Sequence, residues 1–192
     1  ENALNGITAG GNLTISMGSG TGGIVLTSGI TAGNFTLDAS TFGGAIDITG
    51  VSASGAVVVS TGTMGDLSAS QIETTGAVTI DAAAATTGSV TLRSISASGA
   101  VTISMGAGSG ALSVVTNIET NKGLIVDAAK FGGSIDVATI SASGATTISV
   151  AGGDYSAGST FVDGAFTLDA STSSTGTVTL TALSAGGNAT VN

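Results

Sequence analysis

Four aspartates at equivalent positions of a repeating pattern are the residues of this 192-residue chain best suited to chemistry. Each follows a short apolar–x–apolar segment, and they lie roughly 44 residues apart: Asp38, Asp81, Asp127 and Asp169. A serine holds the equivalent position in the alternate units: Ser16, Ser60, Ser104 and Ser149. Hard cations such as Ca²⁺ bind about six to eight oxygen atoms, many of them from carboxylates. The aspartates therefore predict a column that binds divalent cations, with calcium the candidate, or that contacts a neighbouring chain.

Composition excludes several other chemistries. The chain contains no Cys and no His, so disulfide frameworks, zinc fingers, thiol nucleophiles and serine–histidine–carboxylate triads are ruled out. Twelve acidic residues stand against three basic ones, and the net charge of −9 argues against binding nucleic acid through its phosphates. No apolar stretch approaches the roughly 18 residues that span a bilayer. We therefore expect no nucleic-acid partner, no membrane insertion and no enzymatic activity.

A repeat of about 22 residues runs through the whole chain. One apolar position marks it nine times: Ile7, Ile30, Val51, Ile72, Ile95, Ile118, Ile140, Val162 and Leu183. Each unit holds three short apolar–x–apolar segments, which in one unit are Ile95–Ala97, Val101–Ile103 and Leu112–Val114. Alternation with a period of two, bounded by Gly and Ser, is typical of a strand with one buried face. The repeat therefore predicts three short strands per unit.

Such strands are too short to be stable alone, but equivalent strands of successive units can stack about 4.8 Å apart and satisfy each other's backbone groups. The sequence thus predicts an all-β fold, a parallel β-helix (β-solenoid) of triangular section with three strands per rung, a rung being one 22-residue turn. About eight rungs form one continuous solenoid over residues 1–192, which we expect to be a segment of a longer repeat protein. Four antiparallel modules of 44 residues are the alternative.

The rungs are of two alternating kinds, which gives a two-rung super-repeat of 44 residues. One kind carries Ser-Ala-Ser-Gly-Ala-Val-Thr-Ile-Ser (96–104), and the other carries nine of the twelve acids and all three basic residues. Alternation would keep the stacked carboxylates about 9.6 Å apart, close to the Debye length. A purely electrostatic role for the spacing is therefore the alternative to a cation site. Isolated carboxylates two rungs apart supply too few ligands for Ca²⁺ unless a second molecule contributes.

Three further patterns have a structural and a functional interpretation. A column of outward threonines resembles the face of solenoid ice-binding proteins, but Val58 and Ile125 interrupt it. Three Asn-x-Thr sequons begin at the same place in the repeat, at Asn12, Asn34 and Asn188, so the repetition alone explains them. Phe42 and Phe131 each precede Gly-Gly in an acidic rung. We expect these rings to plug a corner of the solenoid, with an intermolecular contact as the alternative.

The chain resembles the β-strand-repeat regions of large secreted bacterial surface proteins: S-layer proteins, repetitive adhesins and filamentous haemagglutinin-like proteins. The resemblance is carried by Gly-Asn-Leu-Thr-Ile-Ser (11–16), by residues 96–104, by the low pI of about 4.1 and by the lack of Cys. It implies export to the bacterial cell surface, calcium-assisted folding and a structural or adhesive role. As partners we expect other copies of the chain, in end-to-end or lateral assembly, and cell-surface polysaccharide. The expected function is a structural, self-assembling segment of a surface layer, sheath or filament. The main alternative is an adhesin stalk, whose binding site lies elsewhere in the full protein. An ice-binding or polysaccharide-processing solenoid is a weaker alternative.

Overall fold

The computed structural model describes residues 2–27, 29–63, 65–173 and 175–192, and in these residues it contains strands and no helix. Sheet 1 is formed by β1 (Asn2–Asn5), β3 (Ile24–Thr27), β6 (Ile46–Ile48), β9 (Leu67–Thr74), β11 (Val90–Ala97), β13 (Ala111–Thr120), β15 (Ser134–Ala142), β17 (Tyr155–Val162) and β19 (Val178–Ala185), with β4 (Ile30–Ala32) and β7 (Val51–Ala53) beside this path. Sheet 2 is formed by β2 (Leu13–Ser16), β5 (Phe35–Ala39), β8 (Val57–Thr61), β10 (Val78–Ala82), β12 (Val101–Met105), β14 (Leu124–Ala128), β16 (Thr146–Val150), β18 (Phe166–Asp169) and β20 (Ala189–Val191).

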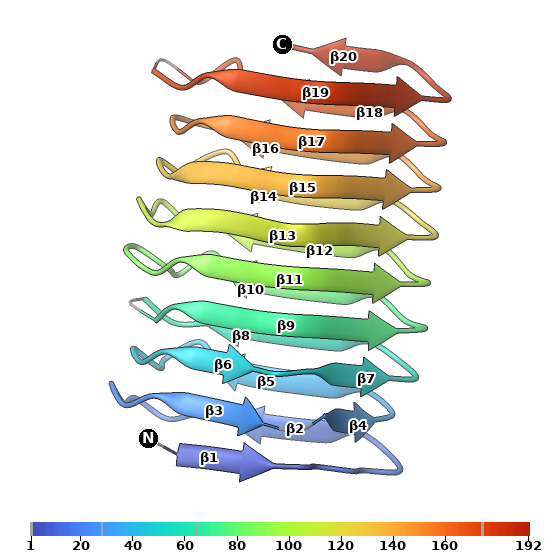
Figure 1. The fold of residues 1–192 in the computed structure, drawn as a ribbon. Helices are drawn as coiled ribbons and strands as arrows, with labels where there is room; N and C mark the ends of the chain where they lie inside the picture. The colour runs from blue at the N-terminus through green and yellow to red at the C-terminus, as the bar shows by residue number, and fades with distance from the viewer. Residues whose placement is uncertain (1, 28, 64, 174) are drawn as a thin grey trace.

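The predicted parallel β-solenoid is confirmed. Each strand pairs in parallel with the strand about 22 residues away, and the rungs rise from the N-terminal to the C-terminal end of a single stack (Figure 1). The predicted register also holds in sheet 2, where one inward column reads Leu13, Phe35, Val57, Val78, Val101, Leu124, Thr146, Phe166 and Ala189. No helix in the described part of the chain is long and apolar enough to cross a bilayer.

In most of the solenoid the three predicted strands of a rung are not separate. From β9 onward the third segment of one unit and the first segment of the next lie in a single strand of sheet 1, so a rung there holds two strands. Only in the first rungs do these segments remain apart, as β3 and β4 and as β6 and β7. Gly29, with a φ of +27°, and Gly50 lie at those two junctions. Later rungs have Ser70 and Gln71 there in β9 and Gly158 there in β17, and the strand continues through them.

The pairing also corrects one position of the repeat. The sequence pattern aligned Val162 with Ile140, whereas in the structure Thr160 pairs with both Ile140 and Leu183. Val162 lies two residues further along, opposite Ala142 and Ala185. The apolar pattern missed this position because Thr160 is a polar residue at a fully buried site.

The core is a thin layer of inward side chains between the two sheets. Ile, Leu, Val and Ala supply most of it, and Phe35, Leu37 and Ile80 are completely buried. Phe42 and Phe131 are also buried, which confirms them as plugs at the corner. The glycines that follow these rings are required by the close stacking. A Cβ atom on Gly44 or Gly133 would lie 1.7 Å from the carbonyl oxygen of a glycine in the preceding rung.

Three buried hydroxyl groups within one stretch of the chain lack a hydrogen-bond partner among the described residues. They belong to Thr146, Tyr155 and Thr160, each at most 1% exposed. Burial raises the pKa of the Tyr155 phenol far above its usual value. Thr146 lies between Leu124 and Phe166 in its column. An unsatisfied hydroxyl in such an apolar column lowers the stability of the folded state.

We expect Thr146→Val to stabilise the protein by about 1 to 3 kcal/mol, because valine has nearly the same shape and removes the unpaired hydroxyl. Chemical denaturation followed by circular dichroism measures the change in the free energy of unfolding. Thr147→Val is the matched control, because Thr147 is the exposed neighbour on the same strand, and it should change stability by less than about 0.5 kcal/mol. A destabilised Thr146→Val variant would contradict the assigned burial.

Candidate functional site

The aspartates singled out from the sequence do form one column with the alternating serines. The pairing of sheet 2 places them in adjacent rungs at the end of its strands, in the order Ser16, Asp38, Ser60, Asp81, Ser104, Asp127, Ser149 and Asp169. We call this set the Ser/Asp column. It lies on the outer surface, since its members point away from the core between inward residues such as Leu37 and Ala39. The two-rung alternation predicted from the sequence is therefore a real feature of the surface.

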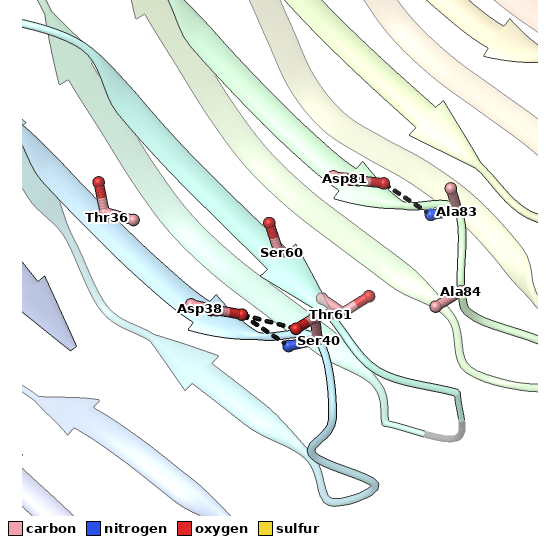
Figure 2. Close-up of a pocket in the computed structure, with 8 residues that line it drawn as sticks. All are labelled: Thr36, Asp38, Ser40, Ser60, Thr61, Asp81, Ala83 and Ala84. Atoms are coloured by element: carbon pink, nitrogen blue, oxygen red, sulfur yellow. Dashed lines mark hydrogen bonds between the residues drawn. The ribbon is translucent and has the colours of Figure 1, made fainter. Parts of the chain in front are cut away.

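Two shallow depressions follow this column, and each lies between two aspartate rungs. The first, of about 600 Å³, is lined by Asp38 and Ser40 on one side, by Asp81 and Ala83 on the other, and by Ser60 between them (Figure 2). The second, of about 640 Å³, lies between the Asp81 and Asp127 rungs, above Ser104. Both are open to solvent and walled by the turns of the aspartate rungs. Their spacing repeats the two-rung period of the sequence.

Each aspartate of the column accepts a hydrogen bond from the backbone amide two residues further on. The Asp38 carboxylate accepts from the amide of Ser40 at 3.1 Å, and Asp81 accepts from Ala83 at 3.0 Å (Figure 2). Asp127 and Asp169 do the same, at 3.3 Å and 3.0 Å. An Asp side chain that binds the amide two residues ahead forms an Asx turn, which is one of the common ways to turn a chain.

The Asx turn leads directly into a backbone turn that carries the chain around the corner. In the first aspartate rung the Phe42 amide donates to the Ala39 carbonyl oxygen at 2.9 Å. The equivalent bonds join Ala85 to Ala82, Phe131 to Ala128 and Ser173 to Ala170. All four aspartates therefore stand at the start of the same kind of corner. Their recurrence has a structural cause that the sequence pattern alone did not reveal.

The serines at the second position of these turns strengthen two of the four bonds. The hydroxyl groups of Ser40 and Ser171 donate to Asp38 and Asp169 at 2.7 Å and 2.6 Å. These hydroxyl groups, and then the backbone amides of the same serines, lower the pKa of Asp38 and Asp169 below the ordinary value of 3.8. Hydrogen bonds favour the ionised carboxylate because it is the better acceptor.

The predicted cation site remains a prediction. Two rungs of a parallel sheet separate neighbouring carboxylates by about 9.6 Å, so one ion cannot contact two members of the column. Among the described residues, no group of three or more His, Cys, Asp or Glu side chains gathers in one place. A calcium ion bound to this column would therefore draw most of its oxygen ligands from water or from a second molecule.

Further polar residues that the sequence did not single out also hold the corners together. Asp66 accepts from the amide of Ser89 in the next rung at 2.8 Å, and Asp154 accepts from the amide and the hydroxyl of Thr177 at 2.8 Å. The two bonds from Thr177 lower the pKa of Asp154. The signal was present in the sequence, because both acids immediately precede the third segment of their unit.

The Asn-x-Thr motifs belong to the same set of corner contacts. The Asn34 side chain donates to the Asn12 side-chain oxygen at 2.7 Å, and its own oxygen accepts from the Ala56 amide at 2.7 Å. The asparagines of neighbouring rungs thus form a short ladder. This ladder gives the sequons at Asn12 and Asn34 a structural role.

No protein family, curated protein or solved structure compared with this chain matches it. The interpretation of the site therefore rests on the geometry of this chain.

We expect the four column aspartates to contribute to stability as hydrogen-bond acceptors. Replacing all four by alanine should lower Tm by several degrees, because each corner loses its Asx turn. Replacing all four by asparagine should lower Tm much less, because the amide oxygen still accepts the bond. Differential scanning calorimetry of the two variants makes the comparison. Equal losses in both would show that the charge, and not the turn, is what matters.

Stability should also fall in acid. The pKa values of Asp38 and Asp169 are lowered in the folded state, so their stabilising contribution is present above about pH 4, near the unfolded value of 3.8. It is lost as the pH falls through the lowered folded pKa. Thermal unfolding between pH 6 and pH 2.5 measures this loss. The variant with Asp38→Asn and Asp169→Asn should have a flatter profile, and a profile as steep as that of the unsubstituted chain would contradict the assignment.

Proposed function

We propose that this chain is a structural, self-assembling segment of a bacterial extracellular surface layer, sheath or filament. The observation that supports it best is that the polar side chains at the corners form hydrogen bonds to the backbone of the solenoid itself. Side chains at the corners bond to the backbone of their own rung or of a neighbouring rung, as the Asp81 carboxylate, the Asn34 amide and the Thr120 hydroxyl do. Such residues serve the rod itself and favour a mechanical function over a catalytic one.

The outer face of sheet 2 is suited to lateral contact between copies. It presents a nearly continuous threonine column beside the Ser/Asp column, on nine parallel strands in register. Short side chains at a constant spacing, with serine and aspartate in regular alternation, form a periodic surface that a second periodic surface can match along its whole length. In this proposal calcium has one role, as a bridge between the carboxylates of two copies, because one column supplies too few ligands.

The stalk of an adhesin is the second candidate. Eight spacings of about 4.8 Å between rungs place the two ends of the solenoid about 38 Å apart. A longer stack of the same kind would carry a binding domain further from the cell. The chain's own surface would then have no ligand beyond cell-surface polysaccharide. An ice-binding face is a weaker candidate, because Val58 and Ile125 pair with threonines in the column and interrupt it. A polysaccharide-processing role is weaker too, since the depressions along the column are open and shallow.

Negative-stain electron microscopy of the purified chain, with calcium and with EDTA, tests the proposal. We expect ordered sheets or bundles with calcium, and their dispersal into thin rods by EDTA. The variant with all four column aspartates replaced by asparagine should form no sheets under either condition. Dispersed single particles under every condition would overturn self-assembly. Assemblies that EDTA leaves unchanged would overturn the role of calcium.

A further inference from the structure

Two apolar side chains interrupt the threonine column on the outer face of sheet 2. Val58 lies on β8 and Ile125 lies on β14, with β10 and β12 between these strands in the stack (Figure 1). Ile125 is 49% exposed, and its neighbours in the column are Thr102 and Thr147. The two interruptions are therefore placed symmetrically about the midpoint between β10 and β12.

A twofold rotation about the same midpoint exchanges serine with aspartate in the Ser/Asp column. It describes a second copy whose sheet 2 faces that of the first, with the rods antiparallel and the strands pointing the same way. β10 then faces β12 of the second copy, β8 faces β14, and β5 faces β16. This rotation puts Val58 of each copy opposite Ile125 of the other. It also puts an aspartate opposite a serine in every pairing: Asp81 opposite Ser104, Asp127 opposite Ser60, and Asp38 opposite Ser149.

The two depressions along the Ser/Asp column fit this arrangement. Ser60 lies in the first, between the Asp38 and Asp81 rungs (Figure 2), and Ser104 lies in the second. In the facing pair, Asp127 of the second copy enters the first depression and Asp81 of the second copy enters the second. The turn amides bind only the Oδ1 atoms of these two aspartates. Their other carboxylate oxygens are therefore able to accept a hydrogen bond from the serine hydroxyl opposite.

A basic residue lies beside the second depression. Lys130 is exposed in the turn that follows Asp127, and it lines this depression together with Asp81 and Asp127. Asp81 of the second copy enters here, and the twofold repeats the contact, so the pair gains two lysine–carboxylate contacts. These contacts offset part of the repulsion between the interleaved carboxylates, which lie about 4.8 Å apart along the rod. Calcium in the bridging role proposed above would offset the rest.

Other arrangements of the same two faces are less favourable. A shift of one rung in the antiparallel pair puts aspartate opposite aspartate along the whole column. Parallel rods that put the aspartates opposite threonines also put Ile125 opposite the Asp127 carboxylate. Parallel rods centred on the threonine column leave Asp81 and Asp127 opposite Ala77 and Gly123, which have no side-chain donor. The antiparallel pair is thus the arrangement that joins donors to acceptors and apolar side chains to each other.

The area of this face is sufficient for a specific contact. Eight spacings of the stack and strands of five residues give a face of about 38 by 17 Å, or about 650 Å² per copy. The total of about 1,300 Å² lies within the range of specific interfaces. The pairings between β5 and β16 use only interior rungs of the described solenoid, and additional rungs at either end would leave them unchanged.

We propose that two copies of this chain pack sheet 2 against sheet 2 as antiparallel rods, about a twofold axis between β10 and β12. Val58 of each copy then packs against Ile125 of the other, which removes both from water, and the Ser/Asp columns interleave. The inference rests on the self-assembly proposed above and adds the partner surface, polarity and register of the lateral contact. The interface is isologous and closes on two copies, so larger sheets use a further surface.

Cysteine cross-linking tests the polarity and the register, because the chain has no cysteine of its own. The single variants Val58→Cys and Ile125→Cys are mixed in EDTA, assembled with calcium and treated with a bismaleimide that spans the roughly 10 Å between packed sheets. Denaturing electrophoresis measures the covalent dimer. We expect about ten times more dimer from the mixture than from either variant alone, because like positions of the two copies lie three rungs apart, about 14 Å along the rod.

The matched control for the face is Thr91→Cys mixed with Ile125→Cys. Thr91 is exposed on the outer face of sheet 1, so this mixture should give no more dimer than the single variants. More dimer from Val58→Cys alone than from its mixture with Ile125→Cys would show that the rods are parallel, and would overturn the proposed polarity.

Two lysine variants test the same contact without cysteine. Lys130→Glu adds a carboxylate beside the depression that receives Asp81 and should shift pairs to single copies in analytical ultracentrifugation. Lys122→Glu makes the same change of charge in the turn between β13 and β14, at the opposite corner, and should leave the pairs intact. Circular dichroism confirms that each variant is folded. Pairs that are equally stable in both variants would place the interface elsewhere.

The outcomes separate this inference from the proposed function. Dimer at the control level, with sheets still visible by electron microscopy, would overturn this pairing and leave lateral assembly through another face. The same cross-linking result with single particles under every condition would overturn both. Dimer from the mixture well above the controls, and reduced by Lys130→Glu, would establish the antiparallel pair.

Discussion

Backbone hydrogen bonding between rungs is the constraint on which the rest of this structure depends. Each rung offers its amides and carbonyls to the rungs above and below it, as when the Val57 amide bonds the Ala77 carbonyl. A residue without an amide would break the ladder, and the chain contains no proline. The corners must stack as closely as the strands, so that glycines such as Gly44 and Gly133 lie where a side chain would collide with the preceding rung. The lack of proline and the glycines at the closely stacked corners follow from this single requirement.

The same constraint determines what the polar side chains do. A corner leaves amides that no strand partner reaches, and the short side chains of Asp, Asn and Thr supply the missing acceptors. Asp38 does so within its own rung, and Asp66 does so for the next one. Residues that at first suggest a metal site are thereby part of the scaffold. Their carboxylates still face solvent, which leaves them able to meet a second molecule at the outer surface.

The sequence predicted those features that depend only on the repeat. The parallel stacking, the inward column from Leu13 to Ala189 and the alternation of serine with aspartate all follow from aligning the units. Features that depend on local backbone geometry were not predicted. The apolar pattern does not show whether a strand continues through the junction between two segments: Gly29 lies at a break, whereas Ser70 and Gln71 lie inside β9 and Gly158 lies inside β17. The position of Thr160 was missed because a buried hydroxyl does not look like a core residue. The Asx turns were missed because a recurring carboxylate fits a ligand and a turn equally well.

Native-state hydrogen exchange tests the central claim most directly, since that claim assigns the column carboxylates to backbone amides. The amides of Ser40, Ala83, Ala129 and Ser171 each donate to an aspartate of the Ser/Asp column. The account predicts that at neutral pH these four amides exchange far more slowly than unprotected amides, and that replacing each aspartate by alanine removes the protection of its own partner. Exchange of all four amides at the rate of an unfolded chain would contradict this account. It would show that the carboxylates accept no backbone hydrogen bonds and are free to bind a ligand.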